Sequence, residues 1–305
     1  MICPFKFFIE GDDVPYTQKE YKKKFHHPKK ELLVPCGKCI ACRSNRAAEW
    51  GIRLQQEAEF HQEKCFITLT YNDKELPVLE VGEEKIPTLY KPDYQKFLKR
   101  LRKKLKDTKI KYFLCGEYGE KEGRPHYHII ILGWKPKMET LIKERDYWFS
   151  PELEKVWQKG IVQVGGVTNE SIFYTTGYLL KATDQEGNLR AKSFNAQSGG
   201  IGKSWLEENE EEVIKNEIKY EGKELPVPRY YRKKLKEKGI EIDYSKIKSD
   251  KKEGELALMR KMVNQGRITD EEEGYEKIVA KVMQARKEAM EMLKTEHERI
   301  KRILK

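Results

Sequence analysis

The sequence lacks long apolar runs. No stretch of its 305 residues approaches the roughly 20 consecutive apolar residues that a membrane-spanning helix needs, and runs such as 129–132 are far shorter. The N-terminal residues MICPFKFF contain no basic region followed by a cleavable apolar segment. We therefore expect no membrane association and no secretion signal.

Cysteine is also scarce, with six residues in the whole chain. In a long chain without a secretion signal, this argues against a disulfide framework and favours reduced thiols or metal ligands. Hydrophobic residues make up only 38% of the sequence and charged residues 36%, although 16 Tyr, 11 Phe and 5 Trp supply bulky core material. The net charge of +11 favours a polyanionic partner.

The order of the expected elements predicts an α+β fold. Helical periodicity is found at residues 45–61, 93–105, 152–158 and 171–181, and strand-like runs at 65–71, 111–119, 126–134 and 161–167. Residues 76–90 contain two prolines and are expected to form an irregular connection. The order β-α-β-β-α-β-α fits an antiparallel sheet flanked by helices, as in split βαβ folds.

Three regions differ in composition. Residues 1–45 hold most of the cysteines and are expected to form a Cys-rich segment, residues 46–205 the α+β domain, and residues 206–305 a charged helical extension. A narrow apolar stripe predicts one helix over residues 270–305. This extension is either a solvated appendage or a specific binding arm.

His126 and His128 occupy alternate positions of an apolar strand, so they share one face of the sheet. The hairpin formed by residues 111–119 and 126–134 brings Glu117 close to this pair. One carboxylate and two imidazoles suit Mg²⁺ or Mn²⁺, and they also suit zinc. Glu120 is an alternative carboxylate in the turn, and two core histidines without a metal remain the structural alternative.

Tyr174, Tyr178 and Lys181 have the spacing of residues that share one helix face. A phenol is a poor nucleophile at neutral pH because its pKa is about 10. A nearby lysine or metal ion would favour the phenolate, and a metal ion would also polarise a scissile phosphate. The alternative is a pair of core or surface aromatic residues.

A third motif lies near the N-terminus, where three cysteines at two-residue gaps resemble a metal knuckle: Cys36, Cys39 and Cys42. Structural zinc usually has four ligands, and Cys3 is the expected fourth, with His26 and His27 as alternatives. An iron–sulfur cluster and free thiols remain open.

Other motifs are weaker. The run GGIGKS lacks the first glycine of a phosphate-binding loop, so we expect no ATP site. The basic runs at 22–30 and 99–104 are either solvated surface or contacts to nucleic-acid phosphates.

The order of these motifs resembles the HUH endonucleases, the tyrosine nucleases that start rolling-circle replication. The closest resemblance is to the replication initiation proteins of microviruses, the gokushovirus branch in particular. It rests on PCGKCIACRSNRAAEW, CFITLTYND, CGEYGEKEGRPHYHIIILGW, YTTGYLLK, SGGIGKSW and PRYYRKK, which span residues 35 to about 234.

The resemblance implies an antiparallel HUH nuclease domain over residues 46–205, with Glu117, His126 and His128 as ligands of a catalytic divalent ion. It implies that Tyr174 and Tyr178 are two nucleophiles used alternately for cleavage and rejoining. Lys181 corresponds to the lysine that follows the tyrosines in this family.

Two positions depart from the family pattern. Tyr127 stands where the residue between the histidines is usually aliphatic, and we expect it to face away from the metal. Gly177 stands where related phage proteins can carry a second lysine. A glycine inside a helix costs about 1 kcal/mol, which suggests that DNA or the sheet approaches closely there.

The expected activity is therefore nicking and rejoining of single-stranded phage DNA at its origin through a 5′-phosphotyrosine, in the host bacterial cytoplasm. The freed 3′-OH would prime host polymerase, and a host helicase would open the duplex. One alternative is a plasmid initiator, relaxase or transposase of the same superfamily. The others are a non-catalytic zinc-dependent DNA-binding protein and a metallohydrolase that uses the two histidines and the glutamate.

Overall fold

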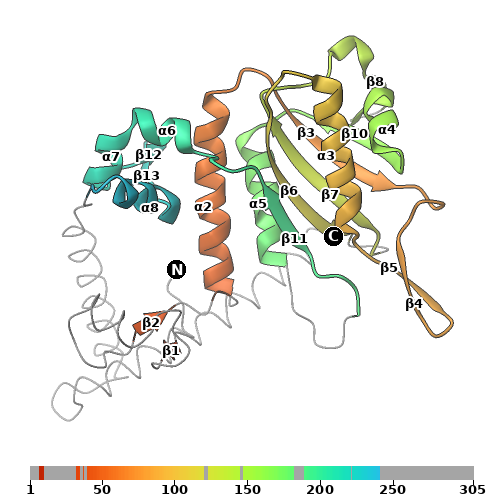
Figure 1. Ribbon diagram of the computed structural model, residues 1–305, viewed down its shortest axis with the longest axis horizontal. Coiled ribbons are helices and arrows are strands. Elements are labelled where there is room, and N and C mark those ends of the chain that lie inside the picture. The colour runs from red at the N-terminus through yellow and green to blue at the C-terminus, as the bar shows by residue number, and fades with distance from the viewer. Residues whose placement is uncertain are drawn as a thin grey trace. The chain divides into compact units, whose positions relative to one another are not determined.

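Figure 1 shows the computed structural model of the chain, which describes residues 7–9, 32–34, 37, 40–119, 123–144, 147–181, 189–220 and 222–240. Arg46–Ile242 forms one compact unit, and Met1–Asn45 forms another with Asp243–Lys305. In the latter unit, β1 (Phe7–Ile9) pairs antiparallel with β2 (Leu32–Val34). The helix expected at 270–305 lies outside the described residues.

The largest sheet among the described residues has seven strands in the order β11-β6-β7-β3-β10-β9-β8, and all neighbours are antiparallel. Its strands are β3 (Lys64–Tyr71), β6 (Lys111–Tyr118), β7 (Pro125–Leu132), β8 (Ile142–Glu144), β9 (Tyr147–Phe149), β10 (Gly160–Gly165) and β11 (Phe194–Gln197). The expected α+β architecture with an antiparallel sheet is confirmed.

Helices flank this sheet and continue beyond it. They are α2 (Ile40–Glu59), α3 (Lys91–Leu105), α4 (Pro151–Trp157), α5 (Asn169–Lys181), α6 (Lys203–Glu208), α7 (Glu210–Lys215), α8 (Arg229–Glu237) and the 3-10 helix η1 (Met138–Thr140). No helix in the described part of the chain is both long and apolar enough to cross a membrane.

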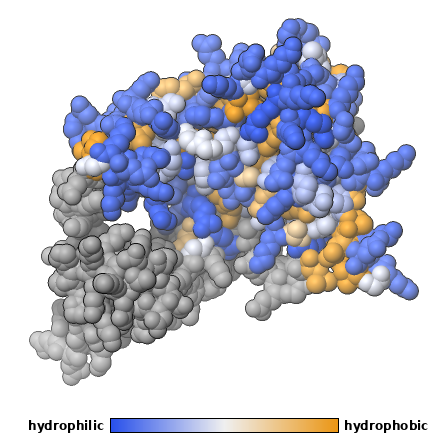
Figure 2. All heavy atoms as spheres, viewed as in Figure 1, coloured by the Kyte–Doolittle hydropathy of each residue, from blue (hydrophilic) through white to orange (hydrophobic). Residues whose placement is uncertain are grey.

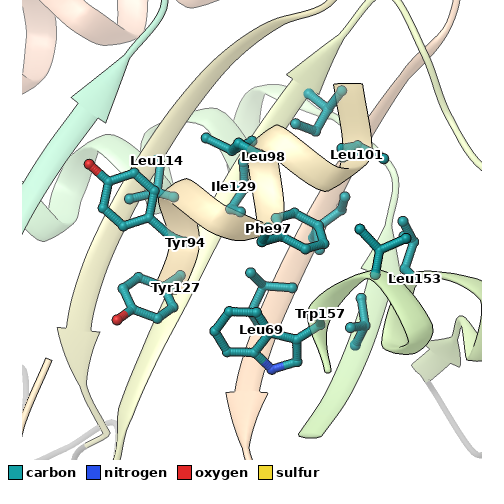
Figure 3. Close-up of a cluster of buried hydrophobic side chains, with 14 of the residues drawn as sticks. Leu69, Tyr94, Phe97, Leu98, Leu101, Leu114, Tyr127, Ile129, Leu153 and Trp157 are labelled. Carbon is teal, nitrogen blue, oxygen red and sulfur yellow. The ribbon is translucent and has the colours of Figure 1, made fainter. Parts of the chain in front are cut away.

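Two helix layers cover the two faces of the sheet. On one face, Phe97 of α3 and Trp157 of α4 pack in a cluster with Tyr127 of β7 (Figure 3). On the other face, Leu54 of α2 and Ile172 of α5 belong to a second cluster. In Figure 1, α3 lies in front of the sheet and α5 behind it. Side chains that alternate along a strand therefore enter two separate cores.

Residues 76–90 are not the irregular connection expected from their prolines. β4 (Val78–Val81) and β5 (Glu84–Pro87) form an antiparallel hairpin whose turn contains Gly82 at φ +62°. Val78 and Leu79 are exposed, and the hairpin contributes to the orange area at the lower right of Figure 2. Because every residue of β4 is exposed, no alternation of burial marks it as a strand.

A buried polar network joins α2 to the sheet. Glu57 is fully buried and accepts hydrogen bonds from Lys111 Nζ at 2.5 Å and from the backbone N–H of Gly202 at 2.6 Å. Burial alone would raise the pKa of Glu57, but hydrogen bonds from Lys111, His61 and Gly202 outweigh it and lower that pKa. Gly202, within the GGIGKS run, thus serves as a structural contact.

The segment after residue 202 has its own apolar cluster, formed by α6–α8 and the loops between them. Its buried members are Trp205, Leu206, Val213, Ile218, Val227, Tyr231 and Leu235. The short strands β12 (Lys219–Tyr220) and β13 (Lys223–Glu224) pair within it. The Tyr231 hydroxyl donates to Gln56 of α2 at 2.5 Å, which fastens this segment to the helix.

Candidate functional site

Strands β6, β7 and β3 gather polar side chains on the face covered by α2 and α5. Glu117 pairs directly with His126, and Cys115 pairs with His128. On β3, Thr68 pairs with His128 from the other side. Because residues that lie opposite one another in a sheet share a face, these side chains form one polar patch. The structure thus brings the predicted carboxylate and both histidines together.

Glu117 and His128 form a buried pair at the centre of this patch. The Glu117 Oε1 atom lies 3.0 Å from His128 Nε2, and the two residues are 7% and 6% exposed. Thr68 Oγ1 lies 3.1 Å from His128 Nδ1. With Glu117 ionised, Nε2 carries the proton that faces the carboxylate, and the neutral ring accepts a hydrogen bond from Thr68. These two contacts fix the orientation of the imidazole.

His126 is the neighbour of this pair and is not hydrogen-bonded to it. The ring centroids of His126 and His128 are 5.9 Å apart. The His126 Nδ1 atom is buried and has no hydrogen-bond partner among the described residues. Burial, with His128 and Arg124 close by, lowers the pKa of His126, which favours the neutral ring that can ligate a metal.

Across the described residues, no three His, Cys, Asp or Glu side chains already stand together as a metal-binding group. The donors nevertheless fit a divalent cation in their chemistry, because Glu117 and His128 touch and His126 offers a nitrogen without a partner. One carboxylate with two imidazoles is also a known zinc set.

Helix α5 brings two tyrosines onto this patch. It begins after Thr168, whose backbone N–H and side chain exchange hydrogen bonds with Ser171 at 2.8 and 3.2 Å. The Tyr178 ring stacks on His128, with centroids 4.9 Å apart and planes 2° from parallel. Phe66 stacks on the opposite face of His128 at 5.7 Å. The imidazole is therefore held between two aromatic rings.

The two tyrosines differ sharply in environment. Tyr174 is 53% exposed, whereas Tyr178 is 2% exposed, although their rings are only 4.8 Å apart. The Tyr178 hydroxyl is hydrogen-bonded to Tyr174 and to Glu117. Burial, followed by these hydrogen bonds and the charge of Glu117, raises the pKa of Tyr178 far above its ordinary value. Tyr178 is thus a neutral phenol buried beside the carboxylate, and Tyr174 lies at the surface.

Two further positions of α5 were singled out from the sequence. Lys181 is the last residue of the helix, and its side chain lies outside the described part of the chain. A Cβ atom built on Gly177 would meet nothing within 4 Å. The expected close approach of the sheet is therefore wrong, and the glycine leaves open space beside the tyrosines.

Tyr127 faces away from the histidines, as expected. It lies in the cluster under α3, and its hydroxyl donates to the carbonyl of Tyr90 at 2.9 Å and accepts from the N–H of Tyr90 at 3.1 Å. The histidine strand is thus anchored to the start of α3 through a residue that the sequence marked only as an exception.

The predicted cysteine knuckle falls largely outside the described residues. Cys42 is described, and it is buried in α2. The other proposed ligands lie outside the described residues, as does the alternative carboxylate of the turn: Cys3, His26, His27, Cys36, Cys39 and Glu120. Zinc binding therefore stays a prediction.

Sequence comparison connects this patch to known proteins. Residues 64–183, which include β3, β6, β7 and α5, match the family described as replication-associated protein ORF2. The chain is 31% identical over 279 residues to replication-associated protein VP4 of Bdellovibrio phage phiMH2K, covering 85% of this chain and 84% of the relative.

Two further viral proteins give similar matches. Replication-associated protein ORF2 of Spiroplasma virus 4 is 30% identical over 262 residues, with 78% of this chain and 79% of the relative covered. Replication-associated protein ORF4 of Chlamydia phage 1 is 31% identical over 186 residues, with 58% and 45% covered. No solved structure matches. The chain therefore belongs to the family of microvirus replication-associated proteins.

Proposed function

We propose that this replication-associated protein nicks and rejoins single-stranded DNA at a phage origin through a 5′-phosphotyrosine, as HUH endonucleases do. The observation that carries the proposal is the contact between two tyrosines of one helix and a buried carboxylate–imidazole pair. Tyr178 stacks on His128 and hydrogen-bonds to Glu117, and Tyr174 lies beside it at the surface.

Glu117, His126 and His128 would hold a divalent cation, Mg²⁺ or Mn²⁺. When bound, such a cation polarises the scissile phosphate and stabilises the negative charge that develops on it. Thr68 and the rings of Phe66 and Tyr178 keep the His128 imidazole in place. A preorganised ligand loses little free energy to reorganisation when the charge develops.

Tyr174 makes the first cut, because its side chain is the one that a DNA strand can reach. Its phenolic oxygen bonds to phosphorus while the bond to the 3′ oxygen breaks. The phenolic proton passes to solvent, and the departing 3′ oxygen takes up a proton to become a free 3′-OH. The DNA 5′ phosphate is then joined to Tyr174 as a phosphodiester.

Tyr178 makes the second cut, at the junction that synthesis regenerates. Glu117 already accepts a hydrogen bond from the Tyr178 hydroxyl and is the natural acceptor of its proton. The newly released 3′-OH attacks the phosphate on Tyr174, which closes the circle and frees that tyrosine.

The setting of this reaction is the host bacterial cytoplasm. The 3′-OH primes a host polymerase, and a host helicase opens the duplex ahead of it, because the 46–205 domain offers no phosphate-binding loop for ATP. The net charge of +11 supports DNA as the partner.

The test uses purified full-length protein with Mn²⁺ and single-stranded oligonucleotides that cover the cognate viral genome. We expect a protein–DNA adduct that survives denaturation, and sequencing of the trapped DNA would locate the nick. His126→Ala/His128→Ala and Tyr174→Phe/Tyr178→Phe should each abolish the adduct. An adduct that persists in the double tyrosine variant would refute the nucleophiles, and no adduct with any oligonucleotide would favour a non-catalytic DNA-binding protein.

A further inference from the structure

Helix α3 carries a one-sided positive charge that the proposed active site does not use. Seven of its 15 residues are Lys or Arg, and its one acidic residue, Asp93, is buried. The apolar side of the helix packs on the sheet through Tyr94, Phe97, Leu98 and Leu101. This packing places α3 on the face of the sheet opposite to α5 and its tyrosines.

Two of these basic residues have structural partners. Arg100 donates to the carbonyls of Val156 and Trp157 at 2.6 and 2.9 Å, which ends α4 against α3. Lys104 forms an ion pair with Glu152 at 2.7 Å. Fold stability therefore explains Arg100 and Lys104.

The remaining charges have no such explanation. Lys96, Lys99 and Lys103 are exposed, and none of them forms an ion pair with any residue that the structure describes. Their spacing of three and four residues aligns them along one stripe, opposite the buried side of the helix. Like charges at this spacing destabilise a helix by a few tenths of a kcal/mol per pair. A polyanion laid along the stripe would remove that repulsion.

We propose that this stripe, Lys96, Lys99 and Lys103, binds the phosphate backbone of duplex DNA at a second surface, on the side of the sheet away from the tyrosines. The aromatic residues of α3, Tyr94 and Phe97, are buried, so the stripe has no ring on which an unpaired base could stack. Single-strand binding usually uses such rings, whereas contacts to phosphates alone hold a duplex without reading its sequence.

This inference does not depend on the tyrosine chemistry, because it concerns a surface remote from it. A protein that holds the duplex behind the site and the single strand within it would stay attached to the circle between two cuts. The surface therefore serves retention on DNA.

The test measures binding of full-length protein to a duplex without the origin sequence, in EDTA, at several salt concentrations. Lys96→Gln/Lys99→Gln/Lys103→Gln should lower the slope of log K against log salt by about 2.7, since each phosphate contact contributes about 0.9. Gln and Lys have similar helix propensity, so the melting temperature should not fall.

The matched control removes the same charge from exposed lysines that do have acidic partners. Lys135, Lys203 and Lys215 pair with Glu63, Glu207 and Glu211 at 3.3–3.4 Å. The control triple, with these three lysines changed to Gln, should change the slope by less than about 1, the share of a single phosphate contact. Equal losses in the two triples, or no loss in the α3 triple, would overturn the proposal.

The remaining arms use the α3 triple with other ligands. Cleavage of a short single-stranded origin oligonucleotide should be unchanged, which separates this surface from the proposed active site. Loss of binding to anionic phosphatidylserine vesicles, with duplex binding intact, would instead identify a lipid surface and refute the assignment to DNA.

Discussion

Replacing each tyrosine of α5 with phenylalanine should separate the roles of the two hydroxyls. The Tyr178 hydroxyl is buried and donates to the Glu117 carboxylate. A hydrogen bond to a charged group contributes about 1.5–3 kcal/mol. A change of 1 kcal/mol shifts the melting temperature of a domain of this size by about 2–4 °C. Tyr178→Phe should therefore lower the melting temperature by about 3–12 °C.

Tyr174→Phe should behave in the opposite way. Its side chain is half exposed, so water can replace the lost hydroxyl contact and stability should stay within about 0.5 kcal/mol of the wild type. Adduct formation with a single-stranded origin oligonucleotide should be lost. Tyr178→Phe should still form the adduct but fail to transfer the strand to a second oligonucleotide.

The assays are a thermal melt without divalent ions and a single-turnover gel assay with Mn²⁺. Tyr90, which is 50% exposed and lies at the start of α3, supplies the control: Tyr90→Phe should change neither measurement. Adducts formed by Tyr174→Phe at the wild-type rate would refute the order of the cuts. A Tyr178→Phe variant as stable as the wild type would refute the hydrogen bond to Glu117.

Three further predictions concern the support of the site. Glu57→Gln should destabilise the fold by about 3–5 kcal/mol at pH 7, because Lys111 loses its buried partner. The folded-state pKa of Glu57 is lowered, so urea titrations should show this difference constant above about pH 5.5 and shrinking as the pH falls below about 4.5. Tyr127→Phe should cost about 1–3 kcal/mol in the same titrations, and an unchanged midpoint would contradict the anchor on α3. Thr68→Val should weaken Mn²⁺ activation of adduct formation about 10–100-fold at an unaltered melting temperature, because His128 loses its orienting partner; Thr70→Val is the control.

The sequence was most informative where the pattern is local. The hairpin that carries the histidines follows from alternating apolar residues and a short turn, and its register, Glu117 opposite His126, follows from the turn length. The spacing of Tyr174 and Tyr178 likewise predicts a shared helix face, and their rings do lie together. The metal and nucleophile roles assigned to these residues remain predictions.

What the sequence could not supply depends on contacts between distant segments. Thr68 and Phe66 touch His128 from a strand that lies 60 residues away along the chain in the case of Thr68. Alternation along CFITLTY places them on one face, but it does not identify the neighbouring strand. Glu57 has the sequence signature of a solvated helix residue, and only the loop at Gly202 buries it.

The central position of the histidine strand also governs how the protein acquires activity during folding. β7 lies between β6 and β3, and contacts such as Thr68–His128 and Arg53–Ile201 join residues 60 and 148 positions apart. Sheets dominated by such distant pairings fold slowly, because the chain must close long loops before the contacts form. The imidazole of His128 reaches its neighbours only when β3, β6, β7 and α5 are all in place. Nuclease competence should therefore return with the slowest refolding phase, so that a partly folded chain cannot nick DNA.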